Sequence, residues 1–473
     1  MSPSTDVVII GAGPAGVLAA AQTAQLGART TLLARDSIGG MAANDGPVPV
    51  RTLAHTARLM RDARQLGQYG VLIEEPVLDY RQLLRRVSAV TSDVREHSTL
   101  RPFFESQGGT VHEGAGTVRF EDPHTVSTES GLRLQADKFI ICTGGVSRKL
   151  PIPGFEYTST HSDAWTLTDV PESMIVVGGG ATGLQVASIF NTFGTRVELF
   201  EAGPRILPGE DADTAAAVSA SFQAAGVRVR EDFGSIDSFA KTPAGVRMAF
   251  SSNGRQQTVE AAMAVVAAGW VADTHALNLP AAAIEITERG FLKVNAYLQT
   301  TAPHIFAAGD VTGHVMLASE GMREGFVAAN NAVRGLSATV TEHLVPAGSF
   351  TDPEYASVGL SEKNARKNHD VVTTTSHFRT SARAIIDGQT TGFCKLIIDR
   401  ASAAVLGCHV VGEKAVDIVQ VASIALAAGT RRVDDLARAN ISFPTYAEIL
   451  IYTAVKAAKE LDLDVGWRGN YTA

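Results

Sequence analysis

Residues 6–36 read DVVIIGAGPAGVLAAAQTAQLGARTTLLARD, and residues 173–203 read SMIVVGGGATGLQVASIFNTFGTRVELFEAG. Each stretch begins with an apolar run, passes through a glycine-rich turn into an apolar-periodic segment, and ends in a second apolar run. This order predicts a strand, a turn, a helix that ends at a glycine, and a second strand, which is the βαβ unit that binds dinucleotides. Because the pattern occurs twice, the sequence predicts two dinucleotide sites and not a solenoid.

The glycines of the two turns have the spacing that phosphate binding requires. They are Gly11, Gly13 and Gly16 in the first turn and Gly178, Gly180 and Gly183 in the second. Glycine permits the tight turn and lets backbone N–H groups and the N-terminus of the following helix approach a pyrophosphate. One such motif is weak evidence, but its repetition in the same strand–turn–helix context is specific.

The residue at the end of the second strand of each unit should read a ribose. In the second unit it is Glu201, whose carboxylate accepts hydrogen bonds from a free 2′-hydroxyl and repels a 2′-phosphate, so we predict NADH in preference to NADPH. Arg205 weakens this prediction, although a solvated surface charge is its simpler interpretation. The matching residue of the first unit is Ala34, followed by Arg35 and Asp36. A ribose acceptor is missing there unless Asp36 or a backbone carbonyl replaces it, so weakened binding of the first dinucleotide is expected.

Length and charge bound the class of protein. A chain of 473 residues predicts several domains, and its net charge of −8 argues against a nucleic-acid partner, which needs a basic face. No apolar run reaches the roughly 18 residues that would predict a membrane span. The chain enters its first strand without a cleavable leader, so the expected compartment is the cytoplasm.

The three cysteines are Cys142, Cys394 and Cys408, widely spaced in apolar strand-like stretches. Thiol or metal chemistry is one interpretation of them. Buried small apolar side chains are the favoured interpretation, and no metal site is predicted.

Three further motifs complete the pattern, namely CTGG at 142–145, HIFAAGDVTG at 304–313 and FTDPEYASVGL at 350–360. With the two glycine turns, they resemble the class I pyridine nucleotide–disulfide oxidoreductases, the family of lipoamide dehydrogenase, glutathione reductase, mercuric reductase and soluble transhydrogenase. The resemblance covers nearly the whole chain. It implies an α/β fold with two Rossmann-like FAD- and NAD-binding domains and a C-terminal α+β dimerisation domain, with FAD and NADH as cofactors and a homodimer as the assembly.

The resemblance also implies domain borders and cofactor contacts. The first part of the FAD-binding domain is expected at 1–150, the NAD-binding domain at 151–272, a central segment with the second part of the FAD site at 273–345, and the interface domain at 346–473. Asp310 is expected to hold the ribityl chain of FAD. The other expected cofactor contacts are Pro14, Ala15, Arg35, Gly40, Thr143, Gly144, Ala181, Thr182, Gln185 and Gly309.

The redox segment departs from the family pattern. Residues 39–51 read GGMAANDGPVPVR, where the family has G-G-T-C-x-N-x-G-C-x-P-S-K. The two cysteine positions are then Ala42 and Pro47, and Arg51 replaces the lysine beside the flavin. Neither Ala42 nor Pro47 can form a thiolate or a disulfide.

Four more positions complete the comparison with the family. Gln185 replaces the glutamate that pairs with the flavin lysine, and Ala181 replaces a mobile tyrosine. Near the C-terminus the family's H-P-T-x-x-E becomes FPTYAE, so Phe443 replaces the acid–base histidine while Glu448 remains.

These departures predict an oxidoreductase without a disulfide relay. NADH would reduce FAD on one face, and Arg51 would stabilise the reduced flavin. On the other face Ala42 and Pro47, with Phe443 and Tyr446 of the partner subunit, would form an apolar slot for a flat acceptor. We therefore predict direct transfer from reduced flavin to a small acceptor, quinone-like or a specialised metabolite, and no disulfide reductase activity. A soluble pyridine nucleotide transhydrogenase and an inactive FAD-binding paralogue or sensor are the alternatives.

Overall fold

The computed structural model describes residues 5–97, 100–340 and 344–469. The chain divides into two compact units. The first unit comprises residues 1–53, 79–149 and 268–342, and the second comprises 54–78, 150–267 and 343–473. Among the described residues, no helix is both long and apolar enough to cross a membrane.

The first unit is built on a mainly parallel sheet. Its parallel strands are β1 (Thr5–Ile10), β2 (Thr30–Leu33), β3 (Thr110–His112), β6 (Arg133–Ile141) and β16 (Ile305–Ala307). They pair in the order β3-β2-β1-β6, and β16 pairs with β6 on its other side. The antiparallel strands β4 (Val118–Asp122) and β5 (Thr125–Thr128) extend the sheet beside the first half of β6. The carboxyl ends of β1, β2, β6 and β16 therefore meet at one edge, where dinucleotides bind in such sheets.

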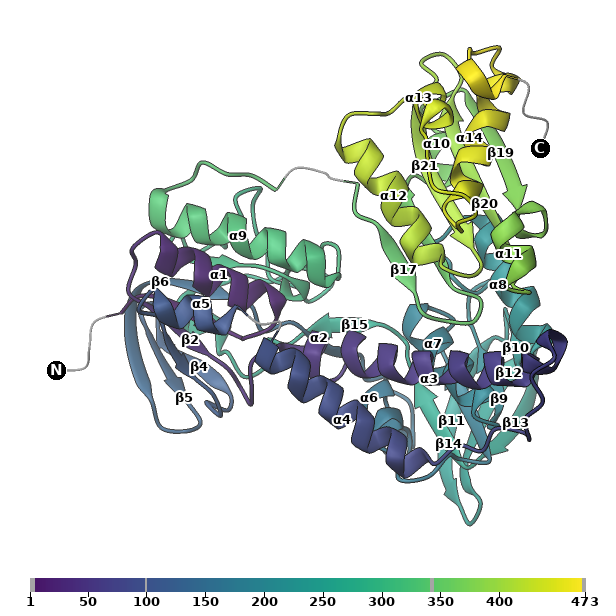
Figure 1. Cartoon of the computed structure of the whole chain (residues 1–473). Helices are drawn as coiled ribbons and strands as arrows, with labels where there is room; N and C mark the ends of the chain where they lie inside the picture. The colour runs from purple at the N-terminus through teal and green to yellow at the C-terminus, as the bar shows by residue number, and fades with distance from the viewer. Residues whose placement is uncertain (1–4, 98–99, 341–343, 470–473) are drawn as a thin grey trace. The chain divides into compact units, whose positions relative to one another are not determined.

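Helices α1 (Pro14–Gln25) and α9 (Ala318–Arg334) lie side by side on this sheet (Figure 1). Their approach depends on a small residue, because a Cβ atom at Gly325 would lie 2.2 Å from the carbonyl oxygen of Ala15. The remaining elements of the first unit are α2 (Gly40–Asn44), the start of α3 (Pro47–Gln65), α4 (Tyr80–His97), α5 (Arg101–Ser106), β7 (Gly145–Ser147) and β15 (Trp270–Ala272).

The second unit contains the other parallel sheet. Its strands β10 (Arg228–Arg230), β9 (Arg196–Phe200), β8 (Ser173–Val177) and β14 (Met263–Val266) pair in this order, with α7 (Ala181–Thr192) joining β8 to β9 and α8 (Ala212–Ala224) joining β9 to β10. The antiparallel strands β11 (Ser235–Thr242), β12 (Gly245–Ser252) and β13 (Arg255–Ala261) form a separate ribbon, and α6 (His161–Trp165) precedes β8.

The C-terminal part of the second unit is an antiparallel sheet with helices against it. The strand order is β17 (Ala347–Ser349), β18 (Tyr355–Gly359), β21 (Val405–Val411), β20 (Phe393–Asp399) and β19 (Val371–His377). Its helices are α10 (Glu362–Ala365), α11 (Ala382–Ile386), α12 (Ala415–Ala427), α13 (Val433–Arg438) and α14 (Glu448–Glu460). The predicted fold class, two dinucleotide-binding βαβ units followed by a C-terminal α+β domain, is confirmed. The predicted domain borders stay a prediction.

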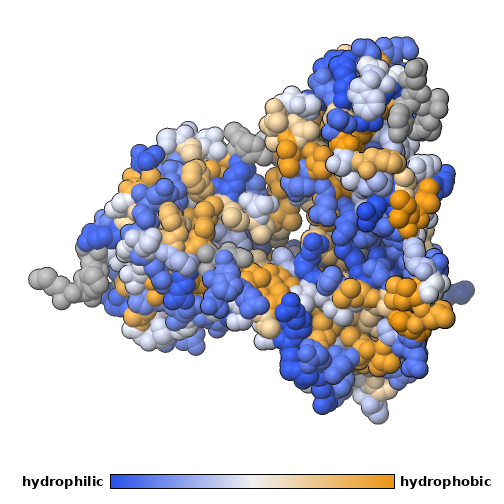
Figure 2. All heavy atoms as spheres, in the orientation of Figure 1, coloured by the Kyte–Doolittle hydropathy of each residue, from blue (hydrophilic) through white to orange (hydrophobic). Residues whose placement is uncertain are grey.

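Apolar side chains reach the surface of the second unit beyond the C-terminal end of α3. Leu72 and Val77 are 89% and 93% exposed, and Figure 2 shows hydrophobic surface in this region. Exposed apolar residues gathered in one segment are typical of a surface that contacts another molecule.

Candidate cofactor and active site

The first glycine turn joins β1 to α1, and packing explains two of its three glycines. Gly11 has φ +105°, and a Cβ atom there would lie 2.2 Å from the carbonyl oxygen of Cys142. A Cβ atom at Gly16 would lie 1.8 Å from the carbonyl oxygen of Gly11. At Gly13 the nearest atom is the Cα of Gly40 at 3.9 Å, so the backbone is open on that side. Only the middle glycine leaves room for a ligand to approach.

The second turn, between β8 and α7, repeats this arrangement. Gly178 has φ +109°, and a Cβ atom at Gly183 would lie 1.9 Å from the carbonyl oxygen of Gly178. Nothing lies within 4 Å of the corresponding position at Gly180. Gly13 and Gly180 are the N-caps of α1 and α7, and neither helix has a side-chain cap. Both helix N-termini therefore present N–H groups to an open face, which fits the pyrophosphate of a dinucleotide. The predicted contacts Pro14, Ala15, Ala181 and Thr182 lie in the first turns of these helices.

The ends of β6 and β16 complete the first site. Thr143 and Gly144 follow β6, and the Thr143 hydroxyl is buried without a hydrogen-bond partner among the described residues. Gly309 and Asp310 follow β16, and Gly309 has φ +80°. Burial raises the pKa of Asp310, and the charge of Glu324 raises it further. A buried hydroxyl without a partner and a half-buried carboxyl beside the first turn fit a polar cofactor such as the ribityl chain of FAD.

Glu324 and His314 belong to this site but are not among the predicted residues. Glu324 is 1% exposed on α9, and its carboxylate accepts hydrogen bonds from the Gly309 N–H at 2.7 Å and from Nδ1 of His314 at 2.7 Å. The hydrogen bond with Glu324 raises the pKa of His314 against the opposing effect of burial. The signal in the sequence is the acidic Glu324 on the apolar face of a helix, where a buried charge needs a partner.

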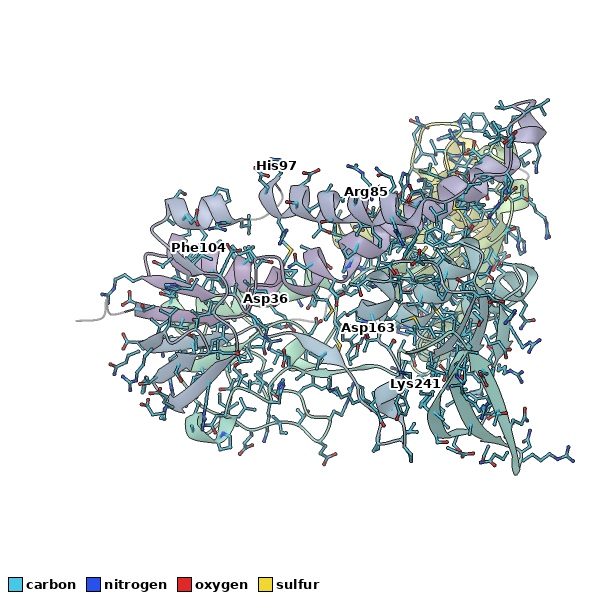
Figure 3. The ribbon with its side chains drawn as sticks, turned by 90° about the horizontal axis from the view of Figure 1, so that it is seen from below. Asp36, Arg85, His97, Phe104, Asp163 and Lys241 are labelled. Atoms are coloured by element: carbon cyan, nitrogen blue, oxygen red, sulfur yellow. The ribbon has the colours of Figure 1, made fainter. Side chains whose placement is uncertain are left out.

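The residues at the ribose position of the first unit make different contacts. Ala34 is 1% exposed. Arg35 forms an ion pair with the buried Asp273, with 2.8 Å between Nη2 and Oδ2. Asp36, labelled in Figure 3, is exposed on the loop after β2, and its carbonyl oxygen accepts a hydrogen bond from the Gly114 N–H at 2.8 Å. Of the three residues, Asp36 is the carboxylate open to a ligand, and its role as a substitute ribose acceptor stays a prediction.

Glu201 lies at the end of β9 and faces the second glycine turn. One carboxylate oxygen accepts a hydrogen bond from the Gly179 N–H at 2.7 Å, and the other accepts one from the Gly203 N–H at 2.7 Å. Each oxygen keeps a second lone pair, so the carboxylate can still accept hydrogen bonds from ribose hydroxyls. Gln185, further along α7, donates to the Ala181 carbonyl at 3.2 Å.

The redox segment is held against the first glycine turn. Gly39 and Gly40 have φ of +104° and +54°, and a Cβ atom at Gly40 would lie 2.6 Å from the Cα of Gly13. Ala42 is half-buried on α2, whereas Pro47 and Arg51 are exposed in the first turns of α3. Gly40 thus ties the start of this segment to the first turn, and the three predicted residues follow it on α2 and α3.

All three cysteines are buried free thiols. Burial raises the pKa of Cys142, and the charge of Glu324 adds to this effect. Cys394 and Cys408 are neighbours in the core of the C-terminal sheet, where a hydrogen bond with Cys394 and burial raise the pKa of the Cys408 thiol. Thiols of raised pKa are poor nucleophiles, as the interpretation of buried apolar side chains predicts. Among the described residues, no group of three or more His, Cys, Asp or Glu side chains could hold a metal ion.

The predicted C-terminal site residues lie in the second unit. Phe443 is 70% exposed. The Tyr446 hydroxyl donates a hydrogen bond to Oδ2 of Asp387 at 3.0 Å. Glu448 is 2% exposed and accepts a hydrogen bond from the Ser381 hydroxyl at 3.1 Å, while its other oxygen is buried without a partner among the described residues. Glu448 is therefore a buried carboxylate of which one oxygen can still accept a hydrogen bond.

Comparison with known proteins extends over nearly the whole chain. The family model "Pyridine nucleotide-disulphide oxidoreductase" matches residues 5–325, and the model of the dimerisation domain of the same family matches residues 345–454. A dihydrolipoyl dehydrogenase of Thermus scotoductus is 32% identical over 465 residues, which cover 96% of this chain and 98% of the relative. A dihydrolipoyl dehydrogenase of Geobacillus stearothermophilus is 30% identical over 468 residues, 95% of each chain.

A solved structure has the same fold. The HOCl-induced flavoprotein disulfide reductase RclA from Escherichia coli matches with a TM-score of 0.84 at 24% identity, covering 95% of this chain and 99% of that one.

These matches correct the prediction of activity. Direct transfer from reduced flavin to a quinone-like acceptor is the wrong expectation, because relatives that share nearly the whole chain are named for oxidation of a dihydrolipoyl group. The expected absence of disulfide reductase activity is contradicted by the same names. Both expectations are drawn from the side chains at Ala42, Pro47 and Phe443.

Proposed function

The chain belongs to the pyridine nucleotide-disulphide oxidoreductase family, and we propose that it couples NADH to a dithiol–disulfide pair through bound FAD. In the proposed reaction a dithiol is oxidised to a disulfide with loss of two electrons and two protons. Both electrons and one proton leave as the hydride of NADH, and the second proton passes to solvent. Bound FAD supplies the two-electron carrier between the two substrates.

The observation that carries this proposal is the repeated glycine turn with an open middle glycine. At both Gly13 and Gly180 the backbone is open at the N-terminus of a helix that has no side-chain cap. The first turn lies beside Thr143 and Asp310, which suit FAD, and the second lies beside Glu201, which suits the adenosine ribose of NADH. A carboxylate at Glu201 supports the choice of NADH over NADPH, because a 2′-phosphate would be repelled.

The dithiol–disulfide part of the proposal is supported by the names of the relatives. From the spacing of the family motif we place Ala42 and Pro47 at the positions of the redox cysteines, and residues 39–51 contain no cysteine. In this proposal the route between sulfur and flavin is the step at which the chain departs from the family pattern. Arg51 supplies a permanent positive charge at the start of α3, where it favours an anionic thiolate or an anionic reduced cofactor.

A homodimer is the proposed assembly. The C-terminal sheet corresponds to the family's dimerisation domain, and the exposed apolar segment around Leu72 and Val77 suits contact with a second copy. Phe443 and Tyr446 would then reach the cofactor site of the partner subunit, beside Ala42 and Pro47.

The experiment separates the two halves of the reaction. The purified chain, loaded with FAD, is mixed without oxygen with NADH, and bleaching of the flavin is expected. Dihydrolipoamide is then offered with NAD⁺, and formation of NADH is expected. Absence of bleaching would reject the proposal as a whole, whereas bleaching without any dithiol-dependent turnover would reject its dithiol half.

The matched variant restores sulfur to the segment. The double substitution Ala42→Cys with Pro47→Cys is expected to raise dithiol-dependent turnover above that of the wild-type chain. The same two substitutions placed at Ala43 and Val48 are the control and are expected not to raise it.

A further inference from the structure

The loop between β9 and α8, residues 203–211, follows Glu201 and folds over the second glycine turn. The Leu207 N–H donates a hydrogen bond to the Gly179 carbonyl at 2.8 Å, and the Gly179 N–H donates to the Glu201 carboxylate at 2.7 Å. The Ile206 N–H donates to Glu231 at 2.9 Å. The loop therefore shares Gly179 with the carboxylate that is proposed to hold the ribose.

The guanidinium of Arg205 is bound within this loop. Nη1 donates to the Leu207 carbonyl at 2.7 Å and to the Ile206 carbonyl at 3.4 Å. Nη2 donates to the Glu210 carbonyl at 2.8 Å and to the Pro208 carbonyl at 3.3 Å. Both terminal nitrogens are thus engaged with backbone oxygens. An arginine that reads a phosphate presents two N–H groups to it in parallel, and this one does not.

The far end of the loop is fixed by a buried charge. Asp211 is the N-cap of α8 and 2% exposed, and its Oδ1 accepts a hydrogen bond from Nζ of Lys395 at 2.9 Å. Lys395 is itself 2% exposed on β20 and also donates to Asp213 at 2.6 Å and to Glu362 at 2.7 Å. The loop is therefore tied at one end to the glycine turn and at the other to the C-terminal sheet.

We propose that Arg205 is a positioning residue for NADH, which holds the loop against the glycine turn and does not read a 2′-phosphate. The inference rests on the proposed function, in which the second turn binds the nucleotide. Without the guanidinium, four carbonyls lose their common donor, and the loop that packs on Gly179 and Glu201 loosens. NADH and NADPH would both contact this turn. NADH depends more on the loop, because Glu201 would hold its free ribose 2′-hydroxyl.

The test measures nucleotide binding to the FAD-loaded full chain by calorimetry, with NAD⁺ and NADP⁺ as probes so that no turnover occurs. The variants are Arg205→Ala and Arg205→Lys. We expect both to weaken NAD⁺ binding by about tenfold, since a lysine carries the charge but cannot reach four carbonyls with one planar group. Retained flavin, together with an unchanged melting temperature of the whole chain by circular dichroism, shows that each variant is folded.

The outcome for a phosphate-reading arginine is the opposite. Arg205→Ala would then weaken NADP⁺ and leave NAD⁺ unchanged, and Arg205→Lys would behave like the wild type; either result overturns the inference. A wild-type chain that binds neither nucleotide would instead reject the proposed function on which the inference rests.

Discussion

The two glycine turns have nearly the same backbone but different surroundings at the ribose position. In the second turn Glu201 accepts hydrogen bonds from two backbone N–H groups beside the open Gly180. In the first turn the corresponding Ala34 is buried and has no polar side chain, and the neighbouring Arg35 is paired with Asp273. The comparison teaches that the turn is fixed by backbone packing, whereas the choice of ligand is made by the residue at the end of the next strand.

The largest expected effect distinguishes the packing glycines from the open one. Gly183→Ala places a Cβ atom 1.9 Å from the Gly178 carbonyl oxygen and is expected to destabilise the chain by about 3 kcal/mol. Gly180→Ala meets nothing within 4 Å, so it should fold, retain FAD and weaken nucleotide binding. Chemical denaturation and calorimetry with NAD⁺ check the two results. Equal destabilisation by both substitutions would remove the distinction between the glycines.

Loss of the buried lysine should affect the second turn and spare the first. Lys395→Met removes the cation that Asp211, Asp213 and Glu362 share, and it is expected to lower the free energy of unfolding by about 3 kcal/mol, chiefly through the buried Asp211. The exposed Lys363→Met on α10 is the control, with an expected change below about 0.5 kcal/mol. Urea unfolding checks both values, and a neutral result for Lys395→Met would show that the cluster does not stabilise the fold.

The ribose carboxylate should be specific for one nucleotide. Glu201→Ala is expected to weaken NAD⁺ binding by about tenfold or more, because hydrogen bonds to a charged group are lost, while FAD is retained. Because Arg205 stays bound to the loop carbonyls, we do not expect this variant to gain NADP⁺ binding of similar strength. Calorimetry with both nucleotides decides, and tight NADP⁺ binding would show that Arg205 had turned toward the phosphate.

The smallest expected effect concerns pH and the first turn alone. His314 has a raised pKa because of Glu324, so its contribution to stability is fully present below the unfolded pKa of about 6.5 and is lost as the pH rises through the higher folded pKa. Because the His314 side chain is 45% exposed and solvent screens its pair with Glu324, His314→Asn should cost only about 0.5 kcal/mol at pH ~5.5 and less at pH ~8.5. The exposed His97→Asn is the control. A pH-independent difference between wild type and His314→Asn in melting experiments would contradict the assignment.

Local patterns allowed much of the fold to be predicted from the sequence. The strand–turn–helix order of residues 6–36 and 173–203 is encoded by apolar periodicity and glycine spacing, which act over a few residues. Both βαβ segments form as predicted: β1-α1-β2 in residues 6–36 and β8-α7-β9 in residues 173–203. For the C-terminal part only an α+β domain could be predicted, because the strand order of its sheet depends on pairing between segments that are distant in the sequence.

The candidate site was less accessible to sequence reasoning. The partners of Lys395 lie up to 184 residues away in the chain, and Glu324 meets Gly309 from another element. Only a charge inside an apolar run, as in FCKLII, marks such residues in advance. From the sequence, Arg205 is interpreted as a solvated surface charge, whereas in the structure its guanidinium donates hydrogen bonds to backbone carbonyls.

The contact between Gly40 and Gly13 has a consequence for how such a site can change over time. Backbone rests on backbone there, and the Asn44 side chain donates to the Gly40 carbonyl, so the start of the segment is held by Gly40 and Asn44 and not by residues 42, 47 or 51. Substitution at 42, 47 or 51 can therefore alter the reactivity of the segment while the contact between Gly40 and Gly13 is kept. Residues 42, 47 and 51 are therefore suitable positions for introducing new reactive side chains into this fold.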